Sequence, residues 1–422
     1  MLVAKFAASN MRRLSTAAFA AVAFAVTVTA ASAPSSSTAD IDVDPLRSQL
    51  EFMLTSISAA NAGVGLELAV VRANDTSAPI TVVAGVACAA PSCFPIKYVH
   101  RESAFCFGSA TKMLTAISLL HAVEAGQLKS LDDLAEPLID RFLQNAGAKN
   151  VSLRAVLGPE IANTTLRHLV SMRSGVPDYD TVQSRAWQLE HPTVDIDPIM
   201  ILTQFVTPGF SCQPGSCGEY STTNFVLLGL ALAGLHNLTR WEDLDQLAIL
   251  PPAAAPLLSN STFPQHGPCS KVARMVHGLT YNGFMPVDTY GLSCTNGWTG
   301  GDWAGSAADA ASIVQSLWGR RGSLLRPSTA DEMLSSMKPL DTGSWGIGVL
   351  YGLGTMDMGS QLPGVYRREP GVLVGHGGET FGFTGTVGYI AKINASLAVF
   401  ANAEDGVATE SAVAGALTLL GV

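Results

Sequence analysis

Apolar positions near the start of the chain change from a helical spacing to a strand-like one. Over residues 45–59 they lie three or four residues apart, which predicts a helix. Two runs rich in Val and Ile follow, over residues 66–72 and 80–86, with the turn-forming pair Asn74-Asp75 between them. The pattern therefore predicts a helix followed by two neighbouring strands.

The middle of the chain has a mainly helical pattern. An extended run over residues 98–107 leads into an apolar helix that ends at Gly126. From Leu131 to about Met337, loops rich in Pro, Gly and Ser separate segments of helical periodicity. These segments lie around Asp140 and over residues 166–172, 225–235 and 307–317.

The last 80 or so residues return to strand-like runs and close with a helix over residues 410–420. Neither end of the chain has enough strands for a covered sheet of its own, so we expect both ends to meet in one antiparallel sheet. The expected fold is α+β, an α/β sandwich whose sheet is flanked by the terminal helices, with an inserted mostly helical domain. The sheet domain would comprise residues 34–112 and 338–422, and the helical domain residues 113–337. The late strand runs are residues 346–351, 371–374, 383–390 and 397–401.

The first 33 residues have the pattern of a secretory signal. Met11-Arg12-Arg13 precedes an apolar run over residues 17–30, and Ala31-Ser32-Ala33 has the form of a cleavage site. The run is shorter than the roughly 18 apolar residues that span a bilayer, so a membrane anchor is less favoured. We expect a secreted, extracellular protein that has no membrane contact after the signal is removed.

The composition argues against nucleic acids and anionic membranes as binding partners. The 422-residue chain is 48% hydrophobic and 14% charged, with a net charge of −9, and it contains no basic run. Nucleic acids and anionic membranes both select clusters of Lys and Arg, so neither is expected to bind.

Seven cysteines agree with export. Six of them form close pairs along the chain, Cys88 with Cys93, Cys212 with Cys217 and Cys269 with Cys294, but six cysteines allow about 15 connectivities. Cys106 remains as a predicted buried apolar thiol. A metal site is the rival interpretation, although the chain has no C-x-x-C and its histidines do not cluster.

Asn-x-Ser/Thr sequons are more frequent than so few asparagines would give by chance, which favours a glycosylated eukaryotic secretory protein. A Thr-rich bacterial export remains the alternative. The sequons begin at Asn74, Asn150, Asn163, Asn237, Asn260 and Asn394.

Candidate chemistry begins with Ser109 and Lys112, which stand three residues apart at the start of the long apolar helix. That spacing places Ser109 Oγ and Lys112 Nζ on one face. A lysine removed from water loses part of its preference for the charged form, and its amine can then accept the hydroxyl proton.

Three further segments add polar groups. Tyr220-Ser221-Thr222 lies between the Cys212/Cys217 loop and an apolar helix, and His376-Gly377-Gly378 lies in the late strand region. Between them, residues 169–178 end in Ser174-Gly175-Val176-Pro177-Asp178.

In this order, the motifs over residues 45–420 resemble those of the serine β-lactamase and penicillin-binding-protein superfamily. The resemblance is to the branch of class C β-lactamases, D,D-peptidases and β-lactamase-like esterases. It implies a β-lactamase/transpeptidase-like fold, with Ser109 as the acylated nucleophile and Lys112 as its proton acceptor or electrostatic partner. Tyr220 would carry the proton to the leaving group and activate water for deacylation, and His376 would line the cleft and bind a carboxylate or steer protons.

The resemblance also implies an oxyanion hole formed by the backbone N–H groups of Ser109 and Glu379, with Gly377 and Gly378 beside the substrate. One departure is Thr222, where the family has an asparagine whose amide contacts both the lysine and the substrate. Asn224 could compensate, but helical geometry would point it elsewhere. The change weakens a β-lactamase or strict peptidase assignment more than an esterase.

We therefore expect a secreted serine hydrolase that acts through an acyl-enzyme on a small ester, amide or D-amino-acid peptide, without a metal or cofactor. The alternative is a catalytically silent protein that uses the same cleft to bind a cell-wall fragment or a protein partner. A Ser-His-Asp hydrolase is a weaker rival because the chain contains no G-x-S-x-G elbow.

Overall fold

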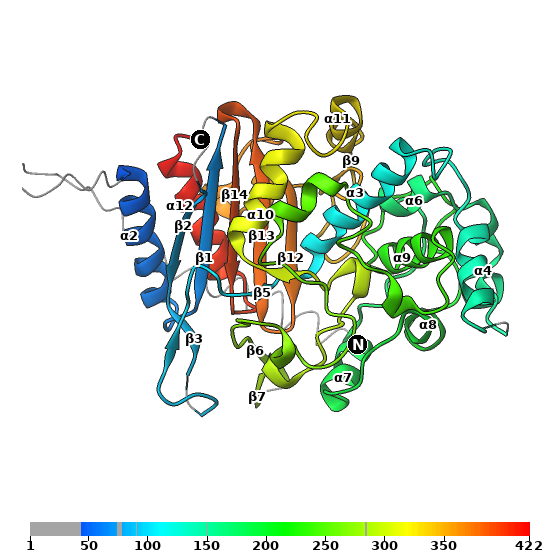
Figure 1. The fold of residues 1–422 in the computed structure, drawn as a ribbon, viewed down its shortest axis with the longest axis horizontal. Coiled ribbons are helices and arrows are strands. Elements are labelled where there is room, and N and C mark those ends of the chain that lie inside the picture. The colour runs from blue at the N-terminus through cyan, green and yellow to red at the C-terminus, as the bar shows by residue number, and fades with distance from the viewer. Residues whose placement is uncertain (1–43, 74–77, 90, 149, 283–284) are drawn as a thin grey trace, which may run out of the picture. The chain divides into compact units, whose positions relative to one another are not determined.

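An eight-stranded antiparallel sheet takes its strands from both ends of the chain (Figure 1). Its order is β2-β1-β14-β13-β12-β11-β10-β9, so the first strand along the chain pairs with the last. The expected meeting of the two ends in one antiparallel sheet is confirmed. The strands are β1 (Leu66–Arg72), β2 (Ile80–Ala84), β9 (Lys338–Pro339), β10 (Leu350–Tyr351), β11 (Met356–Asp357), β12 (Val374–Thr380), β13 (Phe383–Ile390) and β14 (Ala395–Ala401).

The computed structural model describes residues 44–422 except 74–77, 90, 149 and 283–284, and this part of the chain forms one compact unit. The predicted signal segment and the sequon at Asn74 lie outside the described residues. The proposed division into a sheet domain and a helical domain stays a prediction.

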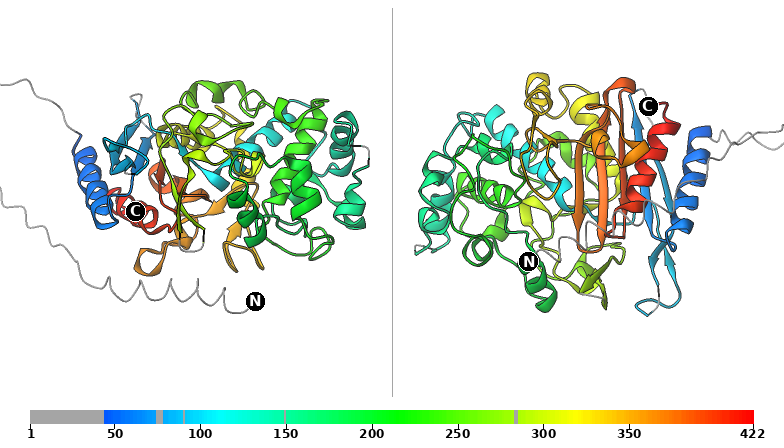
Figure 2. Two further views of the ribbon diagram at one scale, coloured as in Figure 1. Left: turned by 90° about the horizontal axis from the view of Figure 1, so that it is seen from below. Right: turned by 180° about the vertical axis from the view of Figure 1, so that it is seen from behind.

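Helices cover both faces of the sheet. Helices α2 (Pro45–Ala60) and α12 (Val407–Leu419) lie on one face, as the view from behind in Figure 2 shows, and α10 (Ala307–Val314) lies on the other. All seven residues of β14 are buried, because both of its faces are covered. Helix α10 comes from the long middle segment, yet it packs on β1 and β14.

The rest of the middle segment forms a mainly helical part beside β12. Helix α9 (Thr223–Leu235) is its centre, with all residues from Thr223 to Gly234 buried and with contacts to α4, α3 and α6. The other helices are α3 (Thr111–Glu124), α4 (Glu136–Asn145), α5 (Leu153–Val156), α6 (Leu166–Val170), α7 (Val182–Glu190), α8 (Pro198–Met200) and α11 (Pro327–Ser335). Among the described residues, none of the helices is long and apolar enough to cross a bilayer.

Three short antiparallel pairs lie outside the main sheet. They are β3 (Val86–Cys88) with β4 (Lys97–Tyr98), β5 (Phe105–Cys106) with β8 (Ala304–Gly305), and β6 (Leu279–Asn282) with β7 (Met285–Asp288). The β6–β7 hairpin falls in the region expected to be helical. Its residues are mostly exposed, so it lacks the buried alternation by which a strand is recognised.

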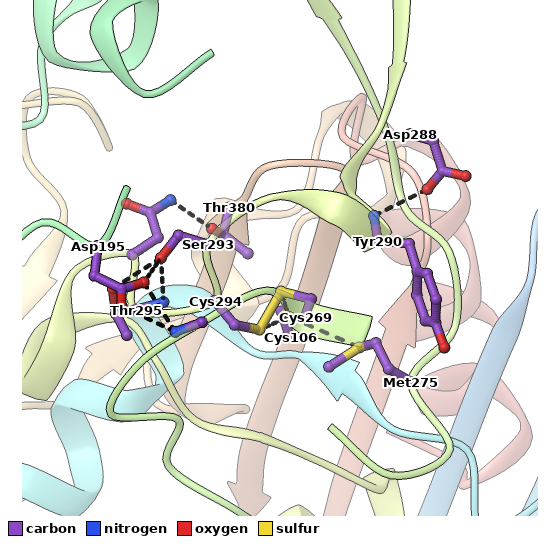
Figure 3. Close-up of a disulfide and its surroundings, with 12 residues drawn as sticks. Cys106, Asp195, Cys269, Met275, Asp288, Tyr290, Ser293, Cys294, Thr295 and Thr380 are labelled. Atoms are coloured by element: carbon purple, nitrogen blue, oxygen red, sulfur yellow. Dashed lines mark hydrogen bonds between the residues drawn. A yellow bond between two sulfur atoms is a disulfide. The ribbon is translucent and has the colours of Figure 1, made fainter. Parts of the chain in front are cut away.

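The three predicted disulfides, Cys88–Cys93, Cys212–Cys217 and Cys269–Cys294, are present. Cys106 is free and half-buried, with its Sγ 4.0 Å from Cys269 Sγ and 3.9 Å from Cys294 Sγ (Figure 3). Burial raises the pKa of its thiol to about 12, so Cys106 carries no thiolate near neutral pH. This environment fits the expected apolar role and does not suit a nucleophile.

Candidate active site

Ser109 lies where the chain passes from β5 into α3. It sits in a single 3-10 turn, Gly108–Ala110, and its side chain is half-buried. The turn begins at Gly108 with a positive φ of 51°, and a Cβ there would lie 2.6 Å from the Glu379 carbonyl oxygen. Only glycine allows this close approach of the Ser109 turn to β12.

Lys112 lies in the first turn of α3 and is completely buried. Its Nζ lies 2.8 Å from Ser109 Oγ and 2.8 Å from the carbonyl oxygen of Gly300. No carboxylate of the described residues lies within ion-pair distance of it. Burial lowers the pKa of Lys112 to about 7, and the more distant Asp178 and Asp180 act in the opposite direction. A large fraction of the amine is therefore neutral near pH 7, able to accept the Ser109 proton.

Tyr220 stands over this pair. The centre of its ring lies 5.2 Å from Lys112 Nζ, and the whole side chain is buried. Its hydroxyl makes no hydrogen bond of standard geometry, although the nearby Ser109 side chain acts to lower its pKa. Burial dominates and raises the pKa of Tyr220 well above its usual value, so the phenol keeps its proton.

His376 lies behind Tyr220, with ring centres 6.3 Å apart, and is fully buried. Nδ1 lies 2.5 Å from the Gly377 carbonyl oxygen, so it carries the proton, and Nε2 accepts from the Tyr351 hydroxyl at 3.2 Å. Burial and the neighbouring Lys112 lower the pKa of His376 to about 3. A neutral ring with both nitrogens engaged does not suit the expected binding of a carboxylate.

The glycines after His376 let parts of the protein approach β12 closely. A Cβ on Gly378 would lie 1.9 Å from the Phe107 carbonyl oxygen, and one on Gly377 would lie 2.5 Å from the Trp345 ring. Gly378 therefore brings the turn of Ser109 against the strand, next to the backbone of Glu379. The expected pair of oxyanion donors, Ser109 and Glu379, lies at this contact.

Thr222 is buried, and its backbone N–H donates to Asp178 Oδ1 at 2.9 Å. Asn224 points away from the lysine: its amide oxygen accepts from Ser174 Oγ at 2.5 Å, and its Nδ2 lies 3.2 Å from Met172 Sδ. Asn224 therefore does not replace the asparagine that the family has at position 222, as helical geometry predicted.

Several site groups were not foreseen. The Gly300 carbonyl is held by a turn over Trp298–Gly300, in which the Thr299 carbonyl accepts from Thr115 on α3 and the Thr299 hydroxyl donates to Phe225 on α9. Every residue has a backbone carbonyl, so the sequence does not indicate which one contacts Lys112. Trp345 and Tyr351, whose rings lie 6.2 and 5.9 Å from that of Tyr220, come from loop and strand residues with no motif around them.

Within the described part of the chain, two groups of side chains have the spacing of metal ligands, and both lie outside this cluster. They are Cys88, Cys93 and His277, and Cys106, Cys269 and Cys294. In each group two of the sulfurs are joined in a disulfide, so they are not available as thiolates.

The cluster therefore brings together a hydroxyl, a buried amine whose pKa is about 7, and a buried phenol that keeps its proton. These groups meet the requirements for acyl transfer: a nucleophile, a base within hydrogen-bond reach and a proton donor for the leaving group.

Comparisons with known proteins identify the family and the fold. Residues 67–420 match the family model described as Beta-lactamase. The fold is similar to a D-amino acid amidase from Ochrobactrum anthropi SV3, solved with L-phenylalanine, at 20% identity and a TM-score of 0.66, covering 90% of this chain and 99% of that one.

It is also similar to a D-stereospecific amidohydrolase from a Streptomyces species, at 21% identity and a TM-score of 0.63 over 85% of this chain and 94% of that one. A penicillin-binding protein from Bacillus halodurans gives 19% identity and a TM-score of 0.62 over 86% and 98%. No match to a curated protein was found.

Proposed function

Because the chain belongs to the beta-lactamase family, we propose that it is a serine hydrolase whose nucleophile is Ser109 and whose base is Lys112. The observation that carries this proposal is the 2.8 Å contact between Lys112 Nζ and Ser109 Oγ, made by a buried amine that forms no ion pair with any described residue. A lysine held this way is a proton acceptor near neutral pH.

In the first half of the reaction, neutral Lys112 takes the Ser109 proton as Oγ attacks the substrate carbonyl carbon. The carbonyl oxygen becomes an oxyanion, which the N–H groups of Ser109 and Glu379 would bind; each such donor contributes about 3 kcal/mol. The bond to the leaving amine or alcohol then breaks. Tyr220 hands its proton to the leaving group and recovers one from Lys112, so the acyl-enzyme forms with no net change in protons.

In the second half, a water molecule attacks the acyl carbonyl and gives its proton to Lys112 by way of Tyr220. The ester bond to Ser109 Oγ breaks, and Oγ regains a proton from the lysine. The products are a carboxylic acid and the free enzyme. The high pKa of Tyr220 supports a role as a proton carrier and not as a resident phenolate.

A small ester or amide without a free carboxylate beside the scissile bond is the substrate class that the site supports best. His376 is neutral and both its nitrogens are engaged, so it offers no cation to a carboxylate of a D,D-peptide or a β-lactam. Thr222 has no side-chain amide, so it lacks the substrate contact that the family's asparagine makes at this position. Among the similar structures, one is a D-amino acid amidase, and we propose D-amino acid amides and esters as the substrates to test first.

We also propose that the protein is secreted. The support is the signal-like pattern of residues 1–33 together with three disulfides, which persist in oxidising compartments.

The test is turnover of a panel by the wild type and by Ser109→Ala. The panel contains D- and L-amino acid amides, p-nitrophenyl esters, nitrocefin and a D-alanyl-D-alanine peptide. We expect ester or amide turnover that Ser109→Ala abolishes, with much slower reaction of nitrocefin and the D-alanyl-D-alanine peptide.

Turnover that persists in Ser109→Ala would refute the assigned nucleophile. Ligand binding without turnover, retained in Ser109→Ala, would instead favour a catalytically silent binding protein.

A further inference from the structure

The segment Ser174-Gly175-Val176-Pro177-Asp178 forms a clamp on the start of α9. Ser174 Oγ donates to the Asn224 side chain at 2.5 Å, and the Thr223 hydroxyl donates to the Pro177 carbonyl at 2.8 Å. The Tyr179 N–H returns a hydrogen bond to the same hydroxyl at 2.9 Å. The clamp thus joins the first two residues of α9, Thr223 and Asn224, to one loop.

Asp178 closes the clamp. Its Oδ1 accepts from the Thr222 N–H at 2.9 Å and from the Asp180 N–H at 3.2 Å. Thr222 precedes α9 and its own side chain makes no capping hydrogen bond. The Asp178 carboxylate therefore satisfies the N–H of the N-cap residue and lies at the start of the helix, where a negative charge is favourable.

Gly175 fixes the clamp against the Cys212–Cys217 loop. Its φ of 76° is in the left-handed region, and a Cβ there would lie 2.3 Å from the Cys212 carbonyl oxygen. The Ser211 N–H donates to the Gly175 carbonyl at 2.8 Å. The disulfide loop, the clamp and the start of α9 are thus held as one unit.

Tyr220 lies two residues before Thr222, so whatever fixes Thr222 limits the movement of the phenol. We propose that Asp178 is a positioning residue of this site, which fixes Tyr220 through the start of α9 and places a negative charge near Lys112. The inference rests on the proposed acyl-transfer function, because it describes how Asp178 acts on Tyr220 and Lys112 in that reaction.

The charge of Asp178 acts on both groups. It raises the pKa of Lys112 against the effect of burial, and it also raises the pKa of Tyr220. Asp180, from the same loop, adds a charge of the same sign, and it is itself faced by Arg185 on α7 and Glu404 after β14. From β12, His376 faces Lys112 as a neutral ring. Asp178 has a pKa raised to about 7 by burial and by Asp180, so its charge is lost in the same range in which Lys112 gains one.

Two substitutions separate the two roles. Asp178→Asn keeps the oxygen that accepts from Thr222 and removes the charge, whereas Asp178→Ala removes both. We expect Asp178→Asn to move the acid limb of the kcat/KM profile to lower pH by about one unit, because Lys112 loses a nearby negative charge. We expect Asp178→Ala to lower kcat by about tenfold more than Asp178→Asn, because Tyr220 is then displaced.

Ser174→Ala is the matched control, since it removes the two hydrogen bonds of the Ser174 hydroxyl, with Asn224 and with the Val176 N–H, and no charge. It should lower kcat and leave the acid limb at its wild-type position. An acid limb that does not move in Asp178→Asn overturns the charge role, and equal kcat values for Asp178→Asn and Asp178→Ala overturn the positioning role. If Asp178→Ala fails to fold, Thr223→Val, which removes two clamp hydrogen bonds, takes its place.

A readout without turnover keeps this inference separate from the proposed function. The 13Cε resonance of Lys112 reports its pKa directly, and it should titrate at lower pH in Asp178→Asn than in the wild type. A wild type that turns over no substrate refutes the proposed function, whereas an unchanged Lys112 titration in an active enzyme refutes the inference.

Discussion

At the scale of single residues, Lys112 decides what this site can do. The amine has no carboxylate partner within ion-pair distance among the described residues and is fully buried. Its hydrogen bonds to Ser109 and the Gly300 carbonyl, with the more distant Asp178 and Asp180, only partly compensate its charged form for the hydration that it loses. The surroundings that make Lys112 a base therefore also make it a cost to folding. Both effects can be measured.

The pH dependence of kcat/KM follows from the pKa of Lys112, which burial lowers to about 7. Only the neutral amine accepts the Ser109 proton, so activity should rise as the pH increases through 7 and reach a plateau about one to two units above it. Steady-state assays between pH 5 and 9 measure this limb. Activity that is constant across that range would contradict the role of Lys112.

Lys112→Met should lower the activity and raise the stability of the folded protein. We expect kcat/KM to fall about 10³-fold and the free energy of unfolding to rise by about 1–2 kcal/mol at pH 7. The gain in unfolding free energy should shrink as the pH rises from 7 towards 10.5, because the lysine of the unfolded wild type loses its proton as the pH approaches 10.5. Urea unfolding at several pH values measures it.

Ser109→Ala is the control for that stability measurement, since it should be as inactive while changing stability little. A Lys112→Met variant less stable than the wild type at pH 7 would contradict the account of the buried amine.

At the scale of elements, local patterns predicted what depends on local geometry. Strands β1 and β13 begin and end where predicted, and the Ser109–Lys112 contact follows from a spacing of three residues in a helical turn. The carbonyl of Gly300 and the ring of Trp345 could not be predicted, because long-range packing places them and neither belongs to a motif. The neutral state of His376 depends on burial, which residue type alone does not reveal.

The contact between β12 and the nucleophile turn gives a prediction about Gly378. Because a Cβ there would lie 1.9 Å from the Phe107 carbonyl oxygen, Gly378→Ala should push the turn from the strand. We expect a loss of about 3 kcal/mol in unfolding free energy and a fall in kcat of about 10²-fold through the displaced oxyanion donors.

Gly291→Ala is the matched control, since a Cβ at Gly291 meets no atom within 4 Å. It should leave kcat and stability close to wild type. A Gly378→Ala enzyme with wild-type kcat would refute the assignment of the oxyanion hole to this contact.

At the scale of the whole molecule, the fold separates the predicted sequons into two groups. Asn150, Asn163 and Asn237 are exposed. Asn260 and Asn394 are half-buried and their side chains are engaged, with the Asn260 amide near Asp309 and the Asn394 oxygen accepting from Gln315.

On secretion from a eukaryotic cell, we expect glycans at the first three of these sites and little or none at Asn260 and Asn394. Release of N-glycans by an amidase in 18O-labelled water, followed by peptide mass spectrometry, marks each occupied asparagine as labelled aspartate. High occupancy at Asn394 would contradict the described packing around it.

The whole account depends on Ser109 being the group that is acylated. Labelling the folded protein with a fluorophosphonate, followed by intact mass measurement and peptide mapping, tests this directly, with Ser109→Ala as the control. The account predicts one adduct per chain, on Ser109, that forms faster as the pH rises through 7 and is absent from Ser109→Ala. A folded wild type with no adduct, or equal labelling of Ser109→Ala, would contradict it.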